Sequence, residues 1–111
     1  METIKNLVPD TAKDIRLNWG GLTKSDHLSE QQLWGTLLVS AIASRNDVVL
    51  AETAKEARTH LGDAAYHAAQ SAASIMAMNN IYYRFLHLAS NKEYGQMPAR
   101  LRMQVIANPG V

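Results

Sequence analysis

Apolar side chains recur every three or four residues along almost the whole chain, which is the spacing of one face of an α-helix. In the first twenty residues they fall at Ile4, Leu7, Val8, Ala12, Ile15 and Trp19. Pro9 is tolerated where a helix starts again, and Gly20-Gly21 is expected to end this first helical stretch. No segment alternates apolar and polar residues as a half-buried strand does. The pattern predicts an all-α helical bundle with short loops.

The clearest local signal is the stretch L-S-E-Q-Q-L at residues 28–33. Ser29 can cap a helix while Gln32 reaches back to it, and Leu28 and Leu33 stand where a hydrophobic staple forms. From this cap we expect a helix that runs to about Ser44. The residues expected to be buried are Leu33, Trp34, Leu37, Leu38, Ala41 and Ile42.

Two more helices follow with their own boundary signals. Asn46 or Asp47 can cap a helix over Val48–Thr59, with Val49, Leu50, Ala54 and Ala57 facing inward. Leu61-Gly62 is expected to close it, because glycine is the usual residue just past a helix end. Asp63 then caps the longest helix, which is expected to reach Ala89.

The two halves of this longest helix differ in the size of their apolar side chains. Its first half carries small residues on one face: Ala65, Ala68, Ala69, Ala72, Ala73 and Met76. Its second half carries bulk that we expect to be buried: Ile81, Tyr82, Phe85 and Leu86. A polar loop, SNKEYGQ, and a last helix over Pro98–Ala107 are predicted next, the helix burying Leu101, Val105 and Ile106. Asn108-Pro109-Gly110 then has the composition of a turn.

Composition restricts the function classes. The 111 residues suit one domain, with 47% hydrophobic and 19% charged residues. The 11 Lys and Arg are dispersed among 10 Asp and Glu, so no basic stripe favours nucleic acid. No stretch of about 20 apolar residues predicts a membrane span, and the first residues, METIKNLVPD, lack the pattern of a signal peptide. We therefore expect a cytoplasmic protein that binds neither nucleic acid nor membrane. The chain has no cysteine, which excludes disulfides and thiolate nucleophiles within it.

One set of residues has the spacing of a helical metal site. Glu52, Glu56 and His60 lie four residues apart, so all three can project from one helix face. The alternative is a solvated charged face, since Lys55 and Arg58 lie among them. We favour the charged face.

The remaining candidates carry weaker signals. His27, His67 and His87 lie in no motif, and we expect surface or capping roles for them. The set Met76, Met78, Tyr82, Tyr83 and Arg84 could line a pocket, but aromatic and Met residues at helical spacing are more often core. No serine lies in a GxSxG turn, and Gly20-Gly21 is too short to cradle a phosphate. No catalytic, cofactor-binding or metal-binding residue is therefore assigned.

Four segments in order, AKDIRLNW, QLWGTLLVSAIASRN, IMAMNNIYYR and LRMQVIANPG, resemble the N-terminal portion of the alkyl hydroperoxide reductase D (AhpD) family, which is related to carboxymuconolactone decarboxylases. The resemblance covers essentially all of residues 1–111. It implies the N-terminal half of a two-copy helical fold, whose second copy carries the catalytic CxxC pair. Residues 1–111 would then form one AhpD-like helical domain.

The resemblance also implies an activity and partners. AhpD proteins are antioxidant peroxidases, usually trimers, that also reduce the disulfide of a peroxiredoxin. Their electrons come from a lipoyl group on a dihydrolipoamide acyltransferase, which lipoamide dehydrogenase keeps reduced. The chemistry uses the CxxC pair with nearby His and Glu residues, and none of these can be carried over to positions in residues 1–111. We therefore predict that this chain alone is inactive.

Laying one copy of the implied repeat on the other puts Arg45 and Val48 where the two cysteines would stand, and neither side chain exchanges thiols. The Ala-rich face from Ala65 to Met76 is where we expect a helix of the second copy to pack. Asn108-Pro109-Gly110 would turn the chain toward that copy. The alternatives are a stand-alone, noncatalytic scaffold or binding protein derived from the family, and a metal or ligand site at Glu52, Glu56 and His60.

Overall fold

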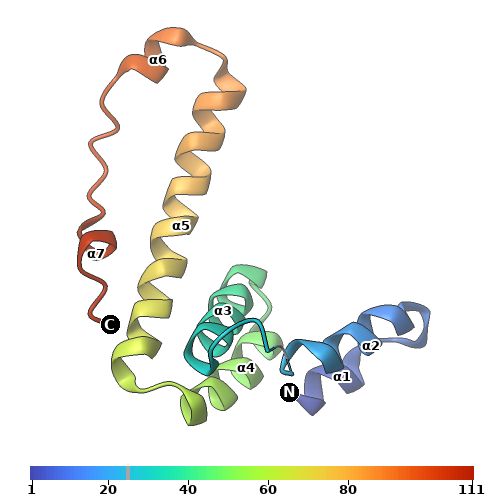
Figure 1. Cartoon of the computed structure of the whole chain (residues 1–111). Coiled ribbons are helices and arrows are strands. Elements are labelled where there is room, and N and C mark those ends of the chain that lie inside the picture. Colours follow the sequence, from blue (N-terminus) through green and yellow to red (C-terminus); the bar gives the residue numbers. More distant parts are fainter. Residues whose placement is uncertain (25) are drawn as a thin grey trace.

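The computed structural model describes residues 1–24 and 26–111, and within them it contains helices and no strand, which confirms the all-α prediction. The elements are α1 (Glu2–Leu7), the short 3-10 helix η1 (Asp10–Ala12), α2 (Lys13–Leu22), α3 (Glu30–Ser44), α4 (Asp47–His60), α5 (Asp63–Ala89), α6 (Lys92–Gln96) and α7 (Gln104–Ala107) (Figure 1). None of the helices in the described part is both long enough and apolar enough to cross a membrane.

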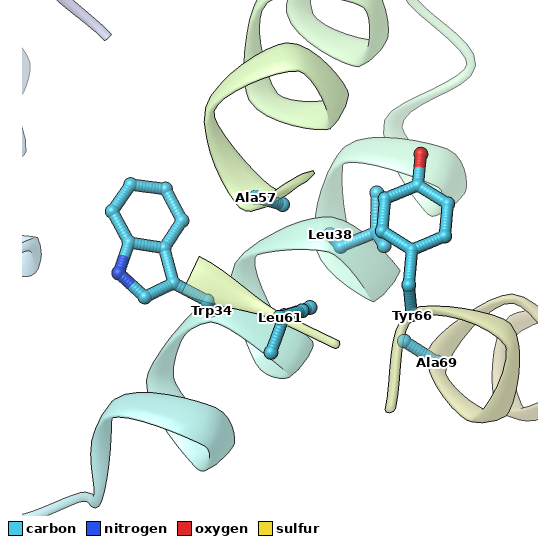
Figure 2. Packing of buried hydrophobic residues seen from close by; sticks show 6 residues of the cluster. All are labelled: Trp34, Leu38, Ala57, Leu61, Tyr66 and Ala69. Atoms are coloured by element: carbon cyan, nitrogen blue, oxygen red, sulfur yellow. The ribbon is translucent and has the colours of Figure 1, made fainter. Parts of the chain in front are cut away.

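The core lies where α3, α4 and the first half of α5 meet. Its buried members are Trp34, Leu38, Ala57, Leu61, Tyr66 and Ala69, which converge in Figure 2. Leu38 on α3 is 1% exposed and Ala57 on α4 is fully buried. Thr53, one turn before Ala57, is buried beside them although its hydroxyl gave no sequence signal for the core. Of the six residues of α3 predicted to be buried, Leu33, Leu37 and Ile42 are only half-buried.

Side-chain hydrogen bonds cap the starts of α3 and α4 as the sequence predicted. The backbone N–H of Gln32 donates to Ser29 Oγ at 3.2 Å, and the N–H of Ser29 donates to Gln32 Oε1 at 3.0 Å. The helix ends at Ser44. Asn46 then caps α4, its Oδ1 accepting from the N–H groups of Val48 at 3.1 Å and Val49 at 3.0 Å.

The substitution Ser29→Ala is expected to lower the free energy of unfolding by about 1 kcal/mol, because it leaves the first turn of α3 without its capping acceptor. Urea unfolding followed by circular dichroism measures the loss. Ser74→Ala is the matched control, since the Ser74 hydroxyl only donates back to Gln70 O at 3.1 Å inside α5. Alanine favours a helix interior, so the control should lose no stability. Equal losses in the two variants would contradict the capping argument.

Two predictions about glycines and caps are wrong, whereas α4 does end at His60, just before Leu61-Gly62, as predicted. Gly20 and Gly21 lie inside α2, which continues to Leu22. A glycine inside a helix costs about 1 kcal/mol but does not by itself end the helix, and neither glycine adopts the left-handed conformation that commonly does. Gly62 is not left-handed either: it is extended, with φ −66° and ψ 162°. It serves as the N-cap of α5, the position predicted for Asp63.

The C-terminal predictions are also wrong in part. Residues 92–96 of the predicted polar loop form α6, because Asn91 Oδ1 caps it by accepting from Glu93 N–H at 2.9 Å. The predicted helix over Pro98–Ala107 is reduced to α7, since Arg100 has φ +52°, a left-handed conformation that interrupts a helix. Leu101 and Val105, which were predicted to be buried, are half-buried. Ile106, also predicted to be buried, is 61% exposed.

The long helix α5 extends well past the core, and the segment after α6 returns alongside it to end near the start of α5 (Figure 1). The radius of gyration is 17.1 Å, compared with about 13 Å for a compact domain of this size. The four bulky residues predicted to be buried in the second half of α5 are not: Ile81 is 75% and Phe85 55% exposed, and Tyr82 and Leu86 are half-buried. The outer half of α5 therefore presents an uncovered apolar surface.

The small-residue face of α5 is partly covered by this chain itself. Ala69 and Ala73 are buried, and α5 packs against α3. Ala68 and Ala72 line a hollow of about 190 Å³ whose other wall includes Val105, Ile106 and Pro109. The face predicted to receive a helix of a second copy thus receives α3 and the returning C-terminal segment, where Gly110 adopts the φ of +82° expected in the turn.

Candidate functional site

The structure does not assemble the metal site considered at Glu52, Glu56 and His60. The Glu56 carboxylate pairs with the N-terminal ammonium group of Met1. His60 Nδ1 lies 2.6 Å from Glu30 Oε1, so His60 and Glu56 have different partners. Among residues 1–24 and 26–111, no three His, Cys, Asp or Glu side chains are placed to hold a metal ion.

His60 instead joins α4 to α3. Its imidazole ring stacks on the Trp34 indole, with ring centroids 4.1 Å apart and planes 5° from parallel. Because a carboxylate can only accept, the imidazole donates its Nδ1 hydrogen to Glu30. This contact holds the last residue of α4 against the first turn of α3. Sequence reasoning missed it, since 30 residues separate His60 from Glu30.

The other histidines lie at the surface, as predicted. His27, His67 and His87 are all exposed, and His27 Nε2 lies 3.7 Å from Asp26 Oδ1. His67 packs edge-on against the buried Tyr66, with ring centroids 6.4 Å apart.

No member of the aromatic and methionine set on α5 is buried, although Met78 and Tyr82 are half-buried, so the prediction that the set is core is wrong. Met76 is 49% and Tyr83 52% exposed. Together with Asn79, Asn80, Arg84 and His87 they line an open hollow of about 660 Å³. All of its lining residues come from α5, so the hollow has one wall and can enclose a ligand only if another surface closes it.

The α3–α4 junction is the place where the implied repeat would carry its thiols. Arg45 ends α3 in the left-handed conformation, with φ 55°, and Val48 is the second residue of α4 and 47% exposed. A helix N-terminus lowers the pKa of a thiol placed there, because the helix dipole favours the thiolate. Neither Arg45 nor Val48 has a nucleophilic side chain, so these two residues supply no thiol chemistry.

Comparison with curated proteins shows similarity along the entire chain to proteins named alkyl hydroperoxide reductase AhpD. Over 111 residues the chain is 57% identical to the Rhodopseudomonas palustris protein, 53% identical to the Streptomyces coelicolor protein and 55% identical to a Bradyrhizobium protein. Each alignment takes in 100% of this chain but only 61% or 62% of the relative. The chain thus spans about three fifths of the length of the curated relatives it matches. No protein-family model matches the chain.

Proposed function

Because the chain belongs to the AhpD family, we propose that it is the N-terminal, supporting portion of an alkyl hydroperoxide reductase of the cytoplasm. The observation that carries this proposal is identity above one half along all 111 residues to relatives with that name, in a chain without cysteine. The thiol chemistry is then a property of a portion beyond these residues.

The reaction we propose for the whole protein is the one that the family resemblance implies. A thiolate attacks the peroxide oxygen, the O–O bond breaks, and the alcohol leaves with a proton. The second thiol displaces water from the resulting sulfenic acid, which forms a disulfide. A dihydrolipoyl group on an acyltransferase partner then reduces that disulfide back to the CxxC dithiol. The CxxC dithiol can also reduce the disulfide of a peroxiredoxin partner.

The exposed apolar surface of α5 is in favour of a structural role for residues 1–111, in which other parts of the protein pack against them. A chain with a radius of gyration of 17.1 Å and exposed Ile81, Phe85 and Leu88 on α5 has apolar surface that monomers rarely leave in water. These three residues lie four and three positions apart, so they form one stripe. We propose that the thiol-bearing portion and neighbouring subunits of a trimer cover this stripe.

The second candidate is a noncatalytic helical scaffold or binding protein derived from the family. The specific observation in its favour is that residues from α3, α4 and α5 already form a buried hydrophobic cluster with one another. The coding sequence after Val111 separates the two candidates, because a CxxC pair there supports the reductase. An assay of peroxide consumption with reduced lipoamide, on this chain and on one extended to the relatives' length, tests the activity itself.

The isolated chain is expected to self-associate through the stripe on α5, so sedimentation at tens of micromolar should show species larger than a monomer. Replacing Ile81 and Phe85 together by Lys is expected to shift the population toward monomer. The matched control places Lys at Gln70 and Ser74, which are exposed on the same helix at the same spacing. A monomeric unsubstituted chain, or equal effects of the two double substitutions, would contradict this prediction.

A further inference from the structure

A cavity of about 710 Å³ lies on the side of the core away from the outer half of α5. Trp19 and Leu22 of α2 form one wall, and Leu33 and Leu37 of α3 form the other, with Val49 of α4 between them. The helix α2 makes its main contacts with α1 and η1, so it stands off from α3 and leaves this space. The volume lies within the range of about 300–1,000 Å³ typical of small-molecule sites.

The chemistry of the lining selects for an uncharged occupant. None of the described residues that line the cavity has an ionisable side chain. Met1 also lines the cavity, and its N-terminal ammonium group is paired with the Glu56 carboxylate. A charged ligand would lose its hydration without gaining a counter-ion, which is strongly unfavourable.

The polar side chains that line the cavity are mostly on α3, and Asn18 of α2 and Thr53 of α4 add one each. Thr36, Ser40 and Ser44 line it from α3, and because they are four residues apart they form a row along one helix face. The Ser44 hydroxyl donates to Ala41 O at 2.7 Å. The hydroxyls of Thr36 and Ser40 make no hydrogen bond to any described residue, so they can bind a ligand's polar group.

From these features we propose that the cavity binds an uncharged amphipathic molecule: an alkyl or aromatic body against the leucines, with a hydroxyl or carbonyl group hydrogen-bonded at Thr36 and Ser40. Either hydroxyl can donate to or accept from such a group. The proposal concerns binding alone and does not depend on the proposed reductase function, since no reacting group lines the cavity.

Calorimetric titration of the chain with 1-decanol tests the proposal. We expect saturable, one-to-one binding that Ser40→Phe weakens at least about tenfold, because the ring fills the cavity. Ala43→Phe is the matched control: Ala43 is exposed on the same helix but does not line the cavity, so its substitution should leave the affinity unchanged. Circular dichroism of both variants verifies that the helices are intact.

Two further titrations test whether the ligand must be uncharged and whether it is hydrogen-bonded at Ser40. Decanoate at neutral pH is expected to bind at least about tenfold more weakly than 1-decanol, because its carboxylate must lose water. Ser40→Ala is expected to weaken 1-decanol binding roughly twofold to tenfold through the lost hydrogen bond. Absence of saturable binding, equal binding of decanoate, or indifference to Ser40→Phe would overturn the proposal. So would loss of binding in a chain extended to the relatives' length, since the protein itself would then occupy the cavity.

Discussion

A chain of these 111 residues is expected to consume no alkyl hydroperoxide above the uncatalysed rate when reduced lipoamide is supplied. The same chain joined to the remaining portion of the Rhodopseudomonas palustris relative is expected to consume it. The reason is chemical: a thiolate is the nucleophile in the proposed reaction, and the chain contains no cysteine. The relative is 57% identical over this whole portion, so the packing surfaces should be compatible.

The assay follows lipoamide oxidation on material whose mass has been verified. A joined protein in which every cysteine of the added portion is replaced by Ser is the control, and it should be as inactive as the short chain. The added portion alone should be impaired, because its own apolar surface would lack α3 to α5. Turnover by residues 1–111 that survives a thiol-blocking reagent would disprove the proposed division of labour.

Leu38→Ala is expected to lower the free energy of unfolding by about 2–5 kcal/mol, the largest stability effect that we predict for one substitution. Leu38 is 1% exposed and lies in the cluster with Trp34, Ala57 and Tyr66. Truncation leaves a void that these neighbours can fill only in part. Since small domains are stable by about 5–15 kcal/mol, the loss is a large share of the total.

Urea unfolding followed by circular dichroism measures this effect, with Ile81→Ala as the matched control. Ile81 also lies on a long helix but is 75% exposed, so its truncation should change the stability by no more than about 0.5 kcal/mol. The comparison should be made at low protein concentration, where association through α5 contributes least. Similar losses in the two variants would show that the outer half of α5 is part of the core in solution.

The features that the sequence predicted correctly are those encoded by neighbouring residues. Ser29 and Gln32 are three positions apart, and their reciprocal hydrogen bonds define the start of α3 without help from the rest of the chain. Asn46 does the same for α4. The end of α5 at Ala89 was also predictable, because the helical spacing stops where polar residues begin.

The features that were predicted wrongly depend on choices that local sequence leaves open. A glycine fits a helix, an N-cap or a left-handed turn, and only the packing around it decides; Gly20 and Gly62 took different conformations from those expected. Exposure was misjudged along the outer half of α5, since periodicity marks an apolar face without showing whether anything covers it. Pairing between distant residues, as in Glu30 with His60, has no local signal at all.

The corner between α3 and α4 is held by hydrogen bonds that do not involve the side chains of Arg45 and Val48, the two positions that the implied repeat aligns with cysteines. Ser44 Oγ accepts from Asn46 N–H at 3.3 Å, and Asn46 Oδ1 caps the next helix, whereas the side chains at positions 45 and 48 point outward and are exposed. The cost of a left-handed residue at position 45, about 1–2 kcal/mol, is already borne by Arg45. Substitutions at positions 45 and 48 are therefore expected to leave the backbone of this corner unchanged, because neither side chain takes part in the hydrogen bonds that hold it.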